Sequence, residues 1–169
     1  VSKESKLTRL GSKIYSNTFT PYFPSKAYDR FLEGIVAVAK GRPVPVVANL
    51  AVTTACPCKC WHCSFAKRGS QQTMSLTTIQ STIAAVQALG ASVIGITGGE
   101  PLLRKDLEET IAAIDDRAIS LLFTTGYRLT RSRVKRLKQA GLEIPVIRLE
   151  HHRADINDRG RNKPGMLDH

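Results

Sequence analysis

The chain has 169 residues and a formal net charge of +11, with 42% hydrophobic and 23% charged residues. These values are typical of a folded globular protein with a sizeable core, and they exclude a disordered chain. No apolar run predicts a membrane span, and the first residues lack the apolar segment of a signal peptide.

Residues 1–45 are predicted to form a helical extension that precedes the main domain. A weak helical stripe over residues 2–19 ends at two prolines. Ser25 can then cap a second helix over residues 26–40. A Gly-Arg-Pro linker follows, and we place the core domain at residues 46–169.

Within this domain, short apolar strands alternate with helices. We expect strands at 46–53, 93–97, 119–124 and 144–149. We expect helices at 76–89, 106–114 and 130–140, and the start of another helix after Pro164-Gly165. This alternation predicts an α/β fold with a parallel sheet, either a barrel or a doubly wound sheet. In such folds, ligands bind at the carboxyl ends of the strands.

All four cysteines lie between positions 56 and 63, directly after the first predicted strand of this domain. Neighbours this close mostly cannot form disulfides, which indicates metal-ligand cysteines in a reducing, cytoplasmic environment. Cys56, Cys60 and Cys63 have the spacing C-x3-C-x2-C, one ligand short of a saturated four-iron cluster. The alternative is a structural zinc site that also uses Cys58. We favour Cys58 as a small buried hydrophobic residue.

A second motif, Gly98-Gly99-Glu100-Pro101, follows the second of these strands. Glycines let a ligand approach the backbone closely, and a glutamate can accept a hydrogen bond from an ammonium group. By itself this motif also fits an ordinary strand-to-helix turn. Its position one β-α unit after the cysteine loop favours a ligand site.

The cysteine spacing, followed by the Gly-Gly-Glu-Pro motif with β-α units in register, resembles the radical S-adenosylmethionine superfamily over about residues 46–165. The resemblance implies a partial, TIM-like barrel of six β-α units. About four of these units are present here, so we expect a truncated chain. The resemblance also implies that Cys56, Cys60 and Cys63 hold a 4Fe–4S cluster whose open iron binds S-adenosylmethionine.

The same resemblance implies further contacts with S-adenosylmethionine. The amino group would meet the Gly-Gly-Glu segment, and the residue before the last cysteine would lie against the adenine. A threonine after the third strand and a glutamate after the fourth would add polar contacts. The implied cofactor-binding residues are His62, Gly98, Gly99, Glu100, Pro101, Thr125 and Glu150.

The implied reaction is reductive cleavage of S-adenosylmethionine to a 5′-deoxyadenosyl radical, which takes a hydrogen atom from a substrate. A flavodoxin- or ferredoxin-type donor would supply the electron. A maturase-type modification of a peptide or small metabolite is favoured over RNA modification. Residues 128–169 nevertheless carry eleven Lys/Arg and five acidic residues, which is consistent with an anionic partner. The alternatives are a non-catalytic zinc or iron–sulfur module with four cysteines, or a basic nucleic-acid-binding domain.

Overall fold

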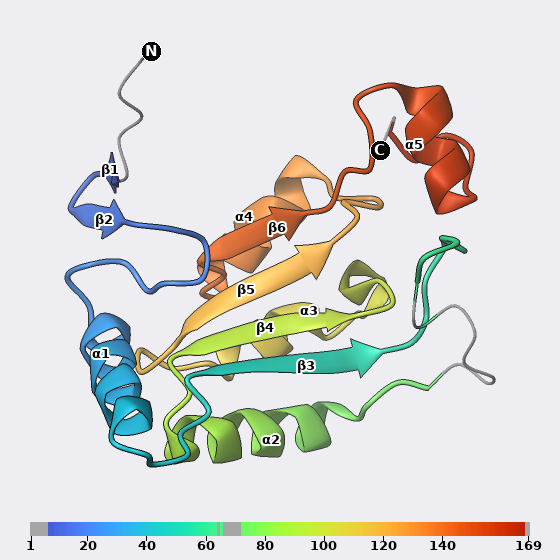
Figure 1. The fold of residues 1–169 in the computed structure, drawn as a ribbon. Helices are drawn as coiled ribbons and strands as arrows, with labels where there is room; N and C mark the ends of the chain where they lie inside the picture. Colours follow the sequence, from blue (N-terminus) through green and yellow to red (C-terminus); the bar gives the residue numbers. More distant parts are fainter. Residues whose placement is uncertain (1–6, 64, 66–71, 168–169) are drawn as a thin grey trace.

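The computed structural model describes residues 7–63, 65 and 72–167. Its centre is a four-stranded parallel sheet in the order β3-β4-β5-β6 (Figure 1). The strands are β3 (Val47–Thr53), β4 (Val93–Gly98), β5 (Ile119–Thr124) and β6 (Ile144–Ile147). The sheet stays open at both edges, as in part of a barrel, which confirms the predicted α/β partial-barrel class. None of the helices in the described ranges has the length and apolar character to cross a membrane.

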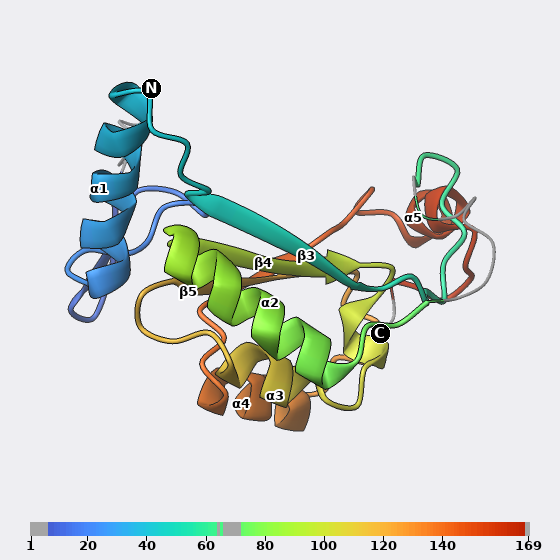
Figure 2. The ribbon, with the colours of Figure 1, turned by 90° about the horizontal axis from the view of Figure 1, so that it is seen from below.

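One face of the sheet is covered by a layer of three helices (Figure 2). They are α2 (Leu76–Leu89), α3 (Leu107–Ala112) and α4 (Arg131–Gln139), and a short 3-10 turn, η1 (Pro101–Leu103), precedes α3. The hydroxyls of Ser75 and Thr130 accept hydrogen bonds from the first turns of α2 and α4. Apolar side chains of the helices pack on alternate strand residues such as Ile94 and Leu122.

The register of the strands assigns their side chains to two faces. Leu50, Ile96 and Leu122 are aligned and belong to the core under the helices. Gly95 and Leu121 are aligned on the opposite, inner face, where Leu121 belongs to a second apolar cluster. The main hydrophobic core therefore lies between the sheet and the helices. The opposite face is the inner face of the partial barrel, the face on which a ligand would bind.

The N-terminal segment differs from the prediction. The helix expected over residues 2–19 is wrong in the described part, which forms an antiparallel hairpin of β1 (Thr8–Leu10) and β2 (Lys13–Tyr15). Lys13 Nζ lies 2.7 Å from a Glu143 carboxylate oxygen, and Tyr15 donates its hydroxyl to the same carboxylate. Contacts with a residue so distant along the chain outweigh a weak local helical pattern.

The helix α1 (Lys26–Ala39) confirms the second predicted helix, and Ser25 caps it. It lies at the amino-terminal ends of the strands (Figure 1). Ala27 and Phe31 pack there with the inner-face cluster of β4 and β5. Phe19, just before this helix, stacks its ring on Phe123 of β5 with centroids 6.4 Å apart. The predicted boundary at residue 46 falls in the connection between α1 and β3, and residues on both sides of it share this cluster.

A final helix, α5 (Ala154–Arg161), follows β6 at the carboxyl-terminal side of the sheet (Figure 1). This helix was not predicted, because residues 154–161 are mostly polar and carry no clear apolar stripe. The helix expected to start after Pro164-Gly165 is not present in the described part: residues 164–167 form turns and bends. Asp158 shapes this segment by accepting backbone N–H bonds from Gly165, Met166 and Leu167.

Candidate active site

Three thiols open into one cavity at the carboxyl ends of the strands. The cavity has a volume of about 580 Å³ and is lined by Cys56, Cys60 and Cys63. This is the size of a typical small-molecule site, on the order of 300–1,000 Å³. The predicted site residues His62, Gly98, Gly99 and Thr125 share the lining, whereas Glu100, Pro101 and Glu150 lie outside it.

The fourth cysteine lies apart from this cavity. Cys58 is buried against Met166 and Cys60, and it does not contribute to the cavity lining. Among residues 7–63, 65 and 72–167, no three histidine, cysteine or acidic side chains converge closely enough to hold a single metal ion. The position of Cys58 outside the cavity lining agrees with the prediction that it is a packing residue.

All four thiols are free, and the surroundings of two of them favour the protonated form. Burial, with smaller contributions from the neighbouring Cys56 and Cys60, raises the pKa of Cys58 to about 12. Burial also raises the pKa of Cys56, although the backbone N–H of Cys58 donates to its sulfur at 3.4 Å. Metal binding to Cys56 therefore has to release a proton.

The two glycines of the second motif lie against the start of the cysteine loop. The N–H of Gly99 donates to Thr53 O at 2.7 Å, and the N–H of Glu100 donates to Ala55 O at 2.8 Å. A Cβ atom on Gly98 would lie 2.2 Å from Thr53 O, and one on Gly99 would lie 2.2 Å from Ala55 O. Only glycine permits this approach, which holds the first cysteine beside the Gly-Gly turn.

The carboxylate of Glu100 is fully buried and is occupied by donors of its own chain. It accepts hydrogen bonds from Thr124 Oγ1 at 2.6 Å and from Leu102 N at 3.0 Å. Thr125 donates both its hydroxyl and its N–H to the other oxygen. The predicted contact between this carboxylate and a cofactor amino group stays a prediction. Pro101 is buried beside it as the first residue of η1.

Three residues of the cavity lining, His62, Arg148 and Arg161, gather around Glu150. Glu150 Oε1 lies 3.1 Å from Arg148 Nε, and 3.5 Å from both His62 Nε2 and a terminal nitrogen of Arg161. His62 Nε2 also lies 3.0 Å from a terminal nitrogen of Arg148. Glu150 thus connects the cysteine loop with the segment after β6. Arg148 was not predicted, although a cation at a strand's carboxyl end is visible in the sequence.

The C-terminal end of α5 contacts the backbone of the cysteine loop. The carbonyl oxygen of Arg161 accepts a hydrogen bond from Lys59 N at 3.0 Å and lies 3.9 Å from Cys60 Sγ. Met166 packs against Cys58 and Cys60. Since the loop has no regular secondary structure, these contacts supply much of its support.

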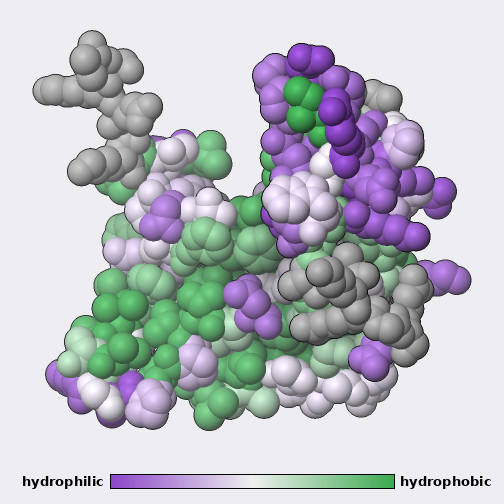
Figure 3. Space-filling model, turned by 45° about the vertical axis from the view of Figure 1, so that its right-hand side comes forward, coloured by the Kyte–Doolittle hydropathy of each residue, from purple (hydrophilic) through white to green (hydrophobic). Residues whose placement is uncertain are grey.

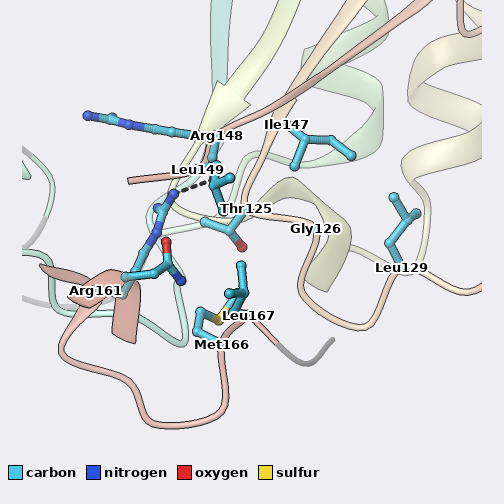
Figure 4. Close-up of a pocket in the computed structure, with 10 residues that line it drawn as sticks. Thr125, Gly126, Leu129, Ile147, Arg148, Leu149, Arg161, Met166 and Leu167 are labelled. Atoms are coloured by element: carbon cyan, nitrogen blue, oxygen red, sulfur yellow. Dashed lines mark hydrogen bonds between the residues drawn. The ribbon is translucent and has the colours of Figure 1, made fainter. Parts of the chain in front are cut away.

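A smaller cavity of about 260 Å³ adjoins the first one (Figure 4). The two share Thr125, Arg148 and Arg161 in their linings. Figure 4 shows Arg161 reaching from α5 toward the backbone of Arg148, to which it donates a hydrogen bond. Met166 and Leu167 close the cavity on the opposite side. The segment after β6 and the segment around α5 therefore form a wall of the candidate site.

Comparison with known proteins identifies the family. The sequence matches the profile of the Radical SAM superfamily over residues 50–166, which is more than half of the chain. The chain belongs to the radical SAM superfamily. Members of this superfamily use a 4Fe–4S cluster and S-adenosylmethionine. The matched range includes the three thiols, the Gly-Gly turn and α5.

Solved radical SAM structures share the fold. SuiB of Streptococcus suis, bound to its precursor peptide SuiA, has a TM-score of 0.64 and 18% identity, over 90% of this chain and 36% of SuiB. BtrN in complex with AdoMet and 2-DOIA has a TM-score of 0.54 and 24% identity, over 69% of this chain and 50% of BtrN. HydG, a maturase of the FeFe-hydrogenase, has a TM-score of 0.59 and 15% identity, over 83% of this chain and 34% of HydG. The chain thus matches half or less of each of these proteins.

The residues around the larger cavity suit the cofactors of a radical SAM protein. Three thiols line one wall, and thiolates are the usual ligands of iron–sulfur clusters. Gly98 and Gly99 of the Gly-Gly turn line the same cavity, and so does Thr125. The cations Arg148 and Arg161 complete the lining. This donor set fits a cluster beside a ligand that carries a carboxylate and hydrogen-bonding groups.

Proposed function

We propose that the chain contains the cofactor-binding part of an enzyme that generates a radical from S-adenosylmethionine. The observation that carries this proposal is the convergence of three thiols, the Gly-Gly turn and Thr125 on one cavity. Four segments after four successive strands meet there. The parallel sheet brings these segments to one edge, where ligands of such folds bind.

The predicted site residues have the following proposed parts in holding the cofactors. Cys56, Cys60 and Cys63 would hold the 4Fe–4S cluster. Gly98 and Gly99 would present peptide groups to the amino group of S-adenosylmethionine. The remaining predicted contacts come from His62, Thr125 and Glu150, while Glu100 and Pro101 keep the Gly-Gly turn in place.

When bound, the cluster and S-adenosylmethionine supply a 5′-deoxyadenosyl radical that takes a hydrogen atom from an unreactive C–H bond. The protein contributes orientation and exclusion of water. Phe123, Val146 and Leu149 give the cavity apolar walls between its polar groups. Contacts with Glu150 hold Arg148 and His62, two residues of the cavity lining, in place.

The test is anaerobic reconstitution of the protein with iron and sulfide, followed by reduction with dithionite in the presence of S-adenosylmethionine. We expect four irons per chain and formation of 5′-deoxyadenosine, measured by mass spectrometry. Variants with Cys56→Ala, Cys60→Ala or Cys63→Ala should lose both. Tight zinc binding without iron uptake by the wild-type protein would refute the proposal.

For the substrate we propose a peptide or a small metabolite. Two observations support this choice. SuiB was solved with a precursor peptide and BtrN with 2-DOIA, and both share this fold. The basic charge of residues 128–169, the main feature in favour of RNA, is partly neutralised, because Arg133 and Arg136 both pair with Glu108. Strong, salt-dependent binding of single-stranded RNA that depends on α4 would favour RNA instead.

We also propose a reducing compartment, consistent with a cytoplasmic protein. Cys56, Cys58, Cys60 and Cys63 are all free thiols. An oxidising environment would pair or oxidise such a cluster before iron could bind. Labelling of free thiols in the protein isolated without oxygen should find four per chain.

A further inference from the structure

A methionine of the segment after α5 is buried against the cysteine loop. Met166 is 4% exposed and packs against Cys58 and Cys60, which are themselves buried. The other two cysteines, Cys56 and Cys63, are partly buried around the same cluster of side chains. The proposed cofactor contacts leave Met166 without a part, so its contact with the cysteine loop needs a physical reason.

Asp158 of α5 holds the backbone of this methionine in place. Its carboxylate accepts hydrogen bonds from the N–H groups of Gly165, Met166 and Leu167, at 2.5, 3.1 and 3.2 Å. Residues 164–167 form no helix or strand of their own, so these three bonds fix the backbone from which the Met166 side chain extends. The helix that contacts the cysteine loop through Arg161 O thus also positions Met166 on that loop.

Met166 and Cys58 together form a layer that we call the sulfur layer. Met166 contacts Cys58 and Cys60, and it also lines the smaller cavity (Figure 4). Cys60 lines the larger cavity, whereas Met166 and Cys58 do not. The neighbouring surface is polar, since Figure 3 shows mainly hydrophilic side chains over α5. Met166 therefore stands where solvent in the smaller cavity would otherwise reach the two cysteines.

Apolar side chains at this place affect how readily a cluster on the thiols accepts an electron. Reduction adds one electron from an external reductant, and no bond of the protein forms or breaks. The added negative charge is less favourable in apolar surroundings than beside water or hydrogen-bond donors. Solvent exposure and hydrogen bonds to the sulfurs are accordingly among the factors that set the potential of iron–sulfur clusters. A thioether donates no hydrogen bond, and a thiol donates only a weak one.

We propose that the sulfur layer keeps the reduction potential of the cluster low, by excluding water and hydrogen-bond donors from the side of the thiols that faces away from the larger cavity. The inference rests on the proposed function, because it concerns the cluster that the three thiols would hold. A low potential makes the reduced cluster a stronger reductant, which reductive cleavage of S-adenosylmethionine requires. Met166 and Cys58 are positioning residues, since they act through the thiol ligands and touch no substrate.

Plain packing is the alternative to this role. If Met166 and Cys58 only hold the cysteine loop, their volume matters and their polarity does not. Leucine and glutamine are both close to methionine in size, but only glutamine brings an N–H donor. Serine and alanine likewise replace Cys58 with and without a strong donor. Two pairs of variants therefore separate polarity from packing.

The test compares Met166→Gln with Met166→Leu, and Cys58→Ser with Cys58→Ala, after anaerobic reconstitution with iron and sulfide. A redox titration followed by electron paramagnetic resonance gives the reduction potential of the cluster without S-adenosylmethionine. Pulsed measurements on the reduced proteins after exchange into heavy water report the exchangeable protons close to the cluster. Neither readout depends on turnover.

At a fixed solution potential, Met166→Gln should raise the ratio of reduced to oxidised cluster at least threefold over wild type. For a one-electron couple this is a shift of about 28 mV. Met166→Leu should change the ratio by less than twofold. The deuterium signal should grow in the glutamine variant only. Cys58→Ser should have a higher potential than Cys58→Ala, for the same reason.

Equal shifts in the glutamine and leucine variants, or no shift in the glutamine variant, would overturn the inference and leave packing as the role of Met166. If Met166→Gln assembles no cluster, the Cys58 pair decides: equal potentials in its serine and alanine variants would also overturn the inference. Failure of the wild-type protein to assemble a cluster would instead count against the proposed function.

Discussion

The buried carboxylate of Glu100 accepts hydrogen bonds from both the hydroxyl group and the backbone N–H of Thr125, at 2.6 and 2.8 Å. The two residues follow neighbouring strands, β4 and β5, and only Thr125 lines the cofactor cavity. Glu100 therefore links the segment after β4 to the segment after β5, and both segments belong to the site.

Glu100→Gln should weaken this link between the two segments. The amide can accept through one atom only, so at least one hydroxyl or N–H of Thr124 or Thr125 loses its acceptor in a buried place. We expect a loss of about 1–3 kcal/mol in unfolding free energy, measured by urea denaturation of the cluster-free protein. Affinity for S-adenosylmethionine in the reconstituted protein should fall as well. Glu109→Gln, on the exposed side of α3, is the control and should change neither.

Cys58→Ala should leave the metal site intact. The Cys58 sulfur packs against Met166, outside the cavity that the other three thiols line. We expect normal iron uptake and an unchanged cluster spectrum, with a loss of about 1 kcal/mol of stability from the smaller side chain. Cys60→Ala is the matched variant and should lose the cluster. A Cys58→Ala protein that no longer takes up iron would make Cys58 a ligand.

Gly99→Ala should disturb both the fold and the site. Its new Cβ would lie 2.2 Å from Ala55 O, so the backbone before Cys56 has to move. We expect a loss of about 1–3 kcal/mol from overpacking and weaker binding of S-adenosylmethionine, measured by calorimetry. Gly160→Ala is the control: its Cβ meets Glu150 only at an ordinary 3.8 Å. Thermal unfolding of that variant should match or slightly exceed that of wild type.

Asp115→Asn should reveal a pH-dependent contribution to stability. A hydrogen bond from Arg117 is the main reason why the pKa of Asp115 is lowered to about 2, and Gln87 adds another. A lowered pKa stabilises the folded state above the ordinary pKa and loses that effect as the pH falls toward the folded value. Because the side chain is about half exposed, we expect only about 0.5–1 kcal/mol at pH 7. The difference between variant and wild type in urea unfolding should persist down to about pH 4 and shrink below it. A difference that stays constant to pH 3 would contradict this assignment.

The sheet and its helices could be predicted because their signals are local. Ser75 and Thr130 mark helix starts, Gly90 ends α2, and the strands are short apolar runs between them. The site could be located for the same reason, because parallel strands bring their carboxyl ends to one edge. The cofactors could be predicted because the cysteine spacing resembles that of a known superfamily.

Other features depend on distant contacts and could not be predicted. The hairpin before α1 is held by Glu143, 130 residues away from Lys13. The support of the cysteine loop by Arg161 joins residues 101 positions apart. The side-chain partners of Glu100 could not be predicted for the same reason. Its motif predicted a ligand contact, but Thr124 reaches its carboxylate only because β5 lies beside β4.

Phe19 stacks on Phe123, and Phe123 lines the larger cavity, so a residue of the N-terminal segment supports one of the side chains of the candidate site. This segment lies outside residues 50–166, which match the family. The side chain that backs Phe123 therefore lies outside the stretch of sequence that carries the three thiols and the Gly-Gly turn.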